Sequence, residues 1–480
     1  MARPARWFYS ALTWAAQPLL RRKLRRRAVA EPGYGQWVEE RFGRYAEQGA
    51  AAQNPAAAQG ALVWIHAVSL GETRAAAILL PALRQQWPGM RLLLTHGTAT
   101  GRAEGQKLLQ PGDQQVWQPW DTPAVVARFL RQFRPAIGIL METEVWPNLV
   151  AACQARGIAL VLANARLSAK SLRKSERMAW LARPAFAALA AVWAQTEADG
   201  ERLRSLGAPV QGVFGNLKFD LVPDAAQLAQ GRQWRAASPR PVVLLASSRE
   251  GEEAMWLEKI MPNRPQTHAG RALAAIKNES NEEADVAVAA ASVQWLIVPR
   301  HPQRFGAVAE LLEQAGLRVA RRSQWGSAPP CTHTDSPAEV WLGDSLGEMA
   351  LYYGLADVAL LGGSFAPLGG QNLIEAAACG CPVVLGPHTF NFAEAAELAC
   401  AAGAGLRVAD MGEGVDAACK LAHGTQPLAT ARRNALQFAA AHRGAAQRTA
   451  EAVVALATAA PTAHAGAKGF APSPSGRGLG

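Results

Sequence analysis

Residues 64–73 (WIHAVSLGET) place a carboxylate where a buried strand gives way to a helix. The apolar run 61–65 is typical of a buried strand, and a helical pattern follows Ser69. Glu72 in the first helical turn can stabilise the helix dipole, or it can be a general base that takes a proton from a hydroxyl group. The dipole predicts a low pKa for Glu72, which burial by a bound ligand or a neighbouring carboxylate from 142–144 could offset.

Other loops of the first half carry polar side chains directly after an apolar run. Parallel strands end at the same edge of a sheet, so we expect these side chains to face one crevice together with Glu72. They are Thr98 after residues 91–95, Glu142 and Glu144 after 136–141, and Arg166 after 158–163. Ser69 and Gly71 form the turn that aims Glu72 into this crevice, which we interpret as the acceptor half of a site.

The segment 357–387 (DVALLGGSFAPLGGQNLIEAAACGCPVVLGP) is the most informative loop of the second half. Its two glycine pairs, the second being Gly369 and Gly370, allow close backbone approach to a ligand. A helix starting near Asn372 offers free N–H groups suited to phosphate, and Glu375 is placed to reach the hydroxyls of a ribose. Taken alone, the glycine pairs fit an ordinary tight turn equally well.

Other side chains suited to phosphate binding follow other predicted strands of the second half. Arg300 and His301 come directly after an apolar run, where a guanidinium can pair with phosphate. Lys218 lies near the domain junction, and Ser248 (or Ser247) is suited to cap the next helix. A capped helix start is the alternative for each loop, but their shared sheet edge favours binding.

Short apolar runs alternate with helical patterns along the whole body of the chain. This alternation predicts an α/β protein with doubly wound parallel sheets. At 480 residues, two domains are expected, with a crevice at the facing strand ends. We place one Rossmann-like domain at 31–222 and a second at 223–457. Two segments fall outside this plan, an inserted loop at 261–290 and a disordered tail at 458–480.

The N-terminal segment 1–30 combines an apolar stretch with a basic cluster. Trp7–Leu20 is followed by six Lys or Arg residues within 21–27, and the chain has a net charge of +11. The stretch is shorter than the roughly 20 residues that span a bilayer. We predict a membrane-anchor helix, lying in or barely crossing the bilayer, with anionic lipids as partners and the body cytoplasmic. The alternative is a solvated basic helix packed on the domain.

The composition gives no sign of a metal site or of a nucleic-acid surface. None of the six cysteines has the spacing of metal ligands, so they are expected to be small core residues in a reducing compartment. The basic residues are not interleaved with aromatic residues on one folded surface, which disfavours nucleic acid. We expect no cofactor.

A set of motifs resembles, in order, the bacterial Kdo (3-deoxy-D-manno-octulosonic acid) transferases. The resemblance extends from the anchor to about residue 450 and is carried by HAVSLGET, METEVWPNL, NARLS, GNLKFD, VPRHPQRF, GDSLGEM and GGSFAPLGGQNLIEAAACGCPVVLGPHTFNF. It implies a glycosyltransferase-B fold in which the domain at 31–222 binds the acceptor, a lipid A precursor, and the domain at 223–457 binds the donor, CMP-Kdo. It also implies inverting, metal-independent transfer at the cytoplasmic face of the inner membrane.

By the same resemblance, Glu72 is the general base, and the second acid falls within 142–144. Lys218, Arg300, Asn372 and Glu375 look like nucleotide or phosphate contacts. The chain departs from the family at residues 247–252 (SSREGE), where the family usually has His in place of Arg249. Only a role open to arginine, such as contact with an anion, therefore carries over to this position. The remaining alternatives are a sugar-nucleotide epimerase of the same fold and a non-catalytic carbohydrate- or lipid-binding scaffold.

Overall fold

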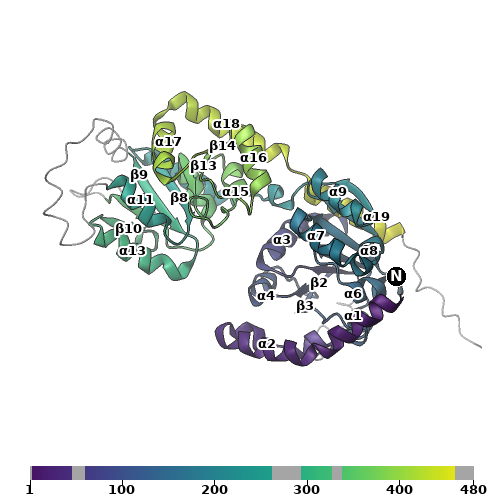
Figure 1. The fold of residues 1–480 in the computed structure, drawn as a ribbon. Coiled ribbons are helices and arrows are strands. Elements are labelled where there is room, and N and C mark those ends of the chain that lie inside the picture. The colour runs from purple at the N-terminus through teal and green to yellow at the C-terminus, as the bar shows by residue number, and fades with distance from the viewer. Residues whose placement is uncertain (1–2, 46–59, 262–292, 327–337, 460–480) are drawn as a thin grey trace, which may run out of the picture. The chain divides into compact units, whose positions relative to one another are not determined.

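The computed structural model describes residues 3–45, 60–261, 293–326 and 338–459 (Figure 1). These residues form two compact units. The first contains the chain up to Leu217 and again from Gly444, and the second contains Lys218–Arg443.

A seven-stranded parallel sheet forms the centre of the first unit, in the order β3-β2-β1-β4-β5-β6-β7. Its strands are β1 (Leu62–His66), β2 (Arg91–His96), β3 (Gln114–Trp117), β4 (Ile137–Met141), β5 (Ala159–Ala165), β6 (Ala191–Ala194) and β7 (Val210–Val213). The order reverses at β1, which pairs with β2 on one side and with β4 on the other. Such a switch point is where open α/β sheets bind ligands.

Helices cover both faces of this sheet, which explains why its strands are apolar throughout. On one face, Ile65 packs in a core with Leu79 of α3 and Val453 of α19. On the other face, Trp64 packs with Phe129 of α5 and Val150 of α6. The helices are α3 (Leu70–Gln86), α4 (Ala99–Gln106), α5 (Pro123–Phe133), α6 (Pro147–Gln154), α7 (Ala169–Arg177), α8 (Ala179–Ala187), α9 (Glu197–Ser205) and α19 (Ala445–Ala459).

The N-terminal helices α1 (Arg3–Ala15) and α2 (Gln17–Ala30) precede this sheet, followed by the short turns η1 (Pro32–Gly35) and η2 (Val38–Phe42). Polar groups tie α1 to the first unit: the Ser10 hydroxyl donates to Asn148 Oδ1 at 3.0 Å, and Trp120 Nε1 donates to the Thr13 carbonyl at 2.8 Å. No helix within the described ranges has the length and apolar composition required to cross a membrane.

The second unit repeats the architecture with the order β10-β11-β9-β8-β12-β13-β14, again parallel. Its strands are β8 (Val242–Ser248), β9 (Gln294–Pro299), β10 (Val319–Arg321), β11 (Val340–Leu342), β12 (Val358–Leu361), β13 (Val383–Leu385) and β14 (Gly405–Arg407). The order reverses at β8, which pairs with β9 and β12. The switch point of this sheet therefore lies between β8 and β12.

Two apolar cores again cover the two faces of the sheet. One includes Trp256 of α11, Leu312 of α13 and Val415 of α17, and the other includes Trp234 of α10 and Leu351 of α14. The helices and short turns are η3 (Leu217–Asp220), α10 (Ala225–Ala237), α11 (Glu252–Ile260), η6 (Pro302–Arg304), α13 (Phe305–Gln314), η7 (Arg322–Gln324), α14 (Met349–Leu355), α15 (Leu373–Ala378), α16 (Ala393–Ala401), α17 (Met411–His423) and α18 (Thr425–Ala441).

The apolar runs 61–65, 91–95, 136–141 and 158–163 form β1, β2, β4 and β5, with ends within two residues of those expected, but β3 was not predicted. It begins with two glutamines, Gln114 and Gln115, and lies at the edge of its sheet, so it lacks the apolar run used to recognise the others.

The domain limits also differ from the prediction. The units meet at 217/218 rather than 222/223, and α19, predicted in the second domain, packs on α3 of the first. The predicted insertion at 261–290 lies outside the described residues, except for Met261. The predicted tail lies outside them from residue 460, whereas 458 and 459 end α19.

A buried carboxylate, Asp357, ties the second sheet together at the start of β12. Its Oδ2 accepts hydrogen bonds from Val242 N (2.8 Å) and from Arg235 of α10, and its Oδ1 accepts one from Arg432 of α18. The carboxylate thus joins two strands to two helices, at the end of the sheet opposite the switch point.

We predict that Asp357→Asn destabilises the second unit by about 2–3 kcal/mol, because charge-assisted hydrogen bonds are lost. Differential scanning calorimetry would show a lower melting temperature for the transition of that unit. An unchanged thermogram would contradict this role for Asp357.

Candidate functional site

Glu72 lies at the switch point of the first sheet, in the first turn of α3 directly after β1. Ser69 is the N-cap of this helix: its hydroxyl accepts from Glu72 N at 3.3 Å and lies 3.0 Å from Glu72 Oε1, to which it donates. Val68 N donates to Glu72 Oε2 at 2.9 Å. The side chain therefore folds back over the turn that begins its own helix, as in a capping box, except that the donor is the residue before the N-cap.

The pKa of Glu72 is raised to about 7, so the predicted low pKa was wrong. Burial is the main cause, and Glu144 and Glu142 add like-charge repulsion. The hydrogen bonds from Val68 and Ser69 lower the pKa, but they do not compensate. A carboxyl group that titrates near neutral pH is suited to general-base catalysis, because it is a stronger base than an exposed glutamate.

Glu142 and Glu144 belong to the loop after β4, the strand beside β1. Glu142 has a left-handed backbone (φ 59°), a conformation that is costly for a residue with a side chain, and its carboxylate lies 3.8 Å from Arg166 Nε. Burial raises the pKa of Glu144, while Trp146 Nε1 donates to its Oε2 at 3.0 Å. The structure thus brings the three predicted acids and Arg166 together at one switch point.

Thr98 and Gly71 have different surroundings. The Thr98 hydroxyl caps α4 by accepting from Gly101 N at 3.1 Å, and it donates to the Val68 carbonyl at 3.1 Å. Its role in this structure is to hold the loop that carries Glu72. Gly71 is exposed, and a side chain at this position would meet only the Ser69 hydroxyl, at 3.9 Å.

Two buried histidines near this loop were not singled out from the sequence. His96 Nδ1 donates to the Ala67 carbonyl at 2.9 Å and so supports the loop after β1. His66 Nδ1 lies 2.7 Å from the Thr95 hydroxyl. Burial lowers the pKa of His66 to about 3 and that of His96 to about 4, so both are neutral at pH 7. Only their position at strand ends, HAV and THG, could have signalled them.

In the second unit, Ser248 is fully buried at the end of β8. Its hydroxyl donates to Glu253 Oε1 at 2.6 Å, and Arg304 Nη2 pairs with Glu253 Oε2 at 2.7 Å. The predicted helix cap was wrong, since Gly251 with φ 90° occupies that position. The Ser248 hydroxyl therefore takes part in a hydrogen-bond network inside the second unit, with Glu253 and Arg304.

Arg249, directly after β8, and Arg300, directly after β9, form a positively charged cluster beside His301. Arg300 Nε donates to Gln371 Oε1 at 3.1 Å. The pKa of His301 is lowered, first by burial and then by the charges of Arg249 and Arg300. Concentrated guanidinium groups at a sheet edge are suited to bind phosphate.

Glu252, the first residue of α11, belongs to the motif 247–252 but was not predicted as a site residue. It is fully buried, and it accepts four backbone N–H groups. Its Oε2 accepts from Arg249 (2.9 Å) and Gly363 (2.7 Å), and its Oε1 accepts from Phe365 (3.1 Å) and Ala366 (3.2 Å). The loops after β8 and β12 thus close around one carboxylate at the second switch point.

The remaining predicted donor residues are the second glycine pair, Asn372 and Glu375 at the start of α15, and Lys218. Gly369 and Gly370 have φ values of 90° and 75°, which favour glycine. Asn372 caps α15, its Oδ1 accepting from Ile374 N at 3.2 Å, and Glu375 lies in the first turn of this helix. The Lys218 ammonium lies 4.7 Å from the centre of the Phe392 ring.

No group of three or more His, Cys, Asp or Glu side chains within the described residues is arranged to hold a metal ion. Four of the cysteines, Cys153, Cys379, Cys381 and Cys419, are buried and Cys400 is partly so, while Cys331 lies outside the described residues.

Comparison with known proteins identifies the chemistry. Residues 36–221 match the family model for 3-deoxy-D-manno-octulosonic-acid transferase (kdotransferase). The 3-deoxy-D-manno-octulosonic acid transferase of Bordetella pertussis is 48% identical over 75% of this chain and 79% of its own length. That of Haemophilus influenzae is 34% identical over 81% of this chain and 84% of its own length.

Among solved structures, a glycosyltransferase from Rickettsia africae has the same fold, with a TM-score of 0.51 and 12% identity, covering 84% of this chain and 99% of that one. The fold alone does not select an activity. The sequence matches do so, and the chain belongs to the 3-deoxy-D-manno-octulosonic acid (Kdo) transferase family of glycosyltransferases.

Proposed function

We propose that this enzyme transfers Kdo from CMP-Kdo to a lipid A precursor of the lipid IVA type in lipopolysaccharide assembly. Transfer inverts the anomeric carbon, requires no metal ion and uses Glu72 as general base. The observation that carries the proposal is the place of Glu72 at the switch point of the first sheet, beside Glu142 and Glu144, where burial raises its pKa to about 7. The family assignment favours this transfer over the epimerase and the scaffold.

The first unit supplies the base. A sugar hydroxyl is a weak nucleophile at neutral pH, and a carboxylate that accepts its proton assists formation of the bond to the anomeric carbon. Glu142 and Glu144 act on Glu72 through their charge, which makes it more basic. Glu142 and Glu144 lie in the loop after β4, and Arg166 directly follows the neighbouring strand β5. We place the acceptor sugar beside these two loops.

The second unit supplies the donor site. When the bond to Kdo breaks, the leaving CMP gains negative charge on its phosphate. Arg300, with Arg249 and His301 beside it, can stabilise that charge, as can Lys218. We place the nucleotide between this cluster and the second glycine pair, with Glu375 directed to the ribose.

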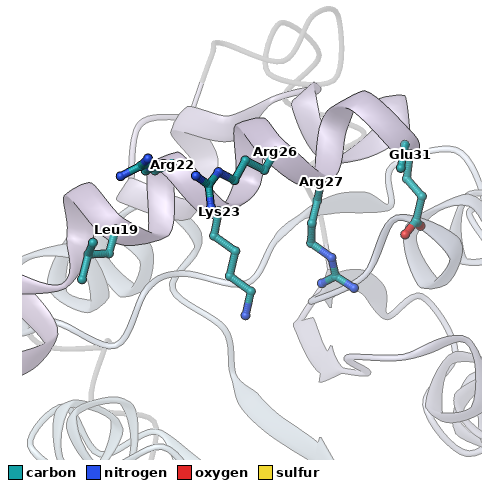
Figure 2. Close-up of a pocket in the computed structure, with 7 residues that line it drawn as sticks. Leu19, Arg22, Lys23, Arg26, Arg27 and Glu31 are labelled. Carbon is teal, nitrogen blue, oxygen red and sulfur yellow. The ribbon is translucent and has the colours of Figure 1, made fainter.

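We also propose that α1 and α2 attach the enzyme to the cytoplasmic side of the inner membrane. Trp7 and Trp14 of α1 are 73% and 70% exposed, although apolar side chains of this size are usually buried. Figure 2 shows the hollow beside α2, where Lys23 and Arg27 extend in the same direction. Arg22 and Arg26 also line it. Exposed aromatic rings beside a basic helix fit the headgroup region of an anionic bilayer.

Replacing Glu72 by Gln removes the base and keeps the side-chain shape. We expect kcat/KM to fall by about 10²- to 10⁴-fold. The assay measures CMP released from CMP-Kdo with the lipid precursor, in the presence of EDTA. Glu176→Gln, an exposed glutamate on α7, serves as control and should retain full activity. Activity of Glu72→Gln near that of the wild type, with the fold intact, would remove Glu72 from the mechanism.

The pKa of Glu72 also predicts the pH dependence of activity. Because the base must be ionised, kcat/KM should fall tenfold per pH unit below about pH 7 and level off above it. A pH–rate profile from pH 5 to 9 measures this. A midpoint near 4.5, the ordinary value for a glutamate, would contradict the raised pKa.

Stability should respond in the opposite direction to activity. The unfolded chain ionises Glu72 near pH 4.5, whereas the folded chain retains the proton up to about pH 7, so folding loses stability over this interval as pH rises. The melting temperature of Glu72→Gln relative to wild type should therefore increase between pH 5 and pH 8. A constant difference would argue against this linkage.

The membrane proposal is tested by removing three charges from α2, in the variant Arg22→Gln/Lys23→Gln/Arg26→Gln. Each basic residue near an anionic surface contributes about 1 kcal/mol, so co-sedimentation with vesicles containing phosphatidylglycerol should weaken at least tenfold. The matched control, Lys170→Gln/Arg173→Gln/Lys174→Gln, removes three exposed charges from α7. Equal losses in both variants would mean that binding follows net charge alone.

A further inference from the structure

Glu252 fills a concavity of backbone N–H groups at the switch point of the second sheet. Such concavities commonly bind phosphate or another anion supplied by a ligand. Here the anion is the protein's own carboxylate, which is fully buried and forms no ion pair with a side chain of the described residues. The N–H groups of Gly363, Phe365 and Ala366 are therefore already occupied, and a donor phosphate has to be held by groups elsewhere in the unit.

Two short series of hydrogen bonds connect the Glu252 carboxylate to the positively charged cluster. Gly363 donates its N–H to Glu252, and its carbonyl accepts from Gly370 N at 2.7 Å. The next residue, Gln371, accepts a hydrogen bond from Arg300 Nε. On the other side, the backbone of Arg249 itself donates to Glu252.

We propose that Glu252 is a positioning residue for the nucleotide donor: it holds the loops after β8 and β12 together and thereby sets the places of Arg249 and Arg300 at the donor phosphate. This inference rests on the proposed use of CMP-Kdo. It also explains why a carboxylate is needed. A carboxylate presents two acceptor oxygens to four donors, whereas a glutamine presents one oxygen and one NH₂ group, which leaves buried N–H groups without an acceptor.

The test is Glu252→Gln in the full-length enzyme. We expect calorimetry to show CMP binding at least tenfold weaker, and KM for CMP-Kdo to rise by a similar factor while kcat changes less. Asp357→Asn is the matched control, because it alters a buried carboxylate at the opposite end of the same sheet. It should lower the melting temperature and leave the affinity for CMP unchanged.

A second variant keeps the test decisive if Glu252→Gln does not fold. Glu252→Ala opens the concavity, and added formate should restore CMP binding in a saturable manner, whereas it should have no effect on Asp357→Asn. Wild-type affinity for CMP in Glu252→Gln, or the absence of formate rescue in a folded Glu252→Ala, would overturn the inference. A wild-type chain that binds no CMP would instead overturn the proposed function, and this inference with it.

Discussion

The backbone N–H groups that follow a central parallel strand have no partner within the sheet, and burial makes an unsatisfied N–H costly. In both units of this protein a glutamate supplies the acceptor. Glu72 accepts from Val68 after β1, and Glu252 accepts from four N–H groups after β8 and β12. Both carboxylates lie at a switch point, where two neighbouring strands lead to helices on opposite sides and the loops diverge.

Both glutamates accept backbone N–H groups at a switch point, but their chemical properties differ because the groups around the two carboxylates differ. Glu72 accepts only one N–H group and one hydroxyl group, and two other carboxylates lie close enough to repel it. Its charged form is therefore poorly stabilised, and it becomes a base near neutral pH. Glu252 has its four N–H donors, which together satisfy both oxygens. A buried carboxylate with both oxygens satisfied is suited to hold two loops together.

The N-terminal helices illustrate how a polar contact can determine which side of a helix faces outward. Ser10 and Thr13 of α1 take part in hydrogen bonds with the first unit, so the aromatic residues Trp7 and Phe8 remain exposed. A helix that packed its apolar side on the sheet would hide these rings. The arrangement supports the proposal that α1 lies along a membrane surface.

The sequence by itself determined the strand pattern, the two-domain plan and the motifs that carry the family resemblance. These features depend on local runs of apolar residues and on residues adjacent in the chain, which are visible without coordinates. Prediction from the sequence failed where contacts between distant segments of the chain determine the position of an element. The polar edge strand β3 takes its place by pairing with β2, and α19 returns to the first unit because its apolar side completes the core beside α3.

The pKa of Glu72 is the clearest case that only the tertiary structure decided. From the sequence, its helix position indicated a low value, because the dipole and N–H groups favour the charged form. Burial and the approach of Glu142 and Glu144, which are about seventy residues away in the chain, reverse that sign. Likewise, the motif 247–252 includes Glu252, but the sequence could not show that its carboxylate accepts a hydrogen bond from Gly363 N. Electrostatic and hydrogen-bonding environments are set by groups brought together in space, and that proximity is a property of the fold.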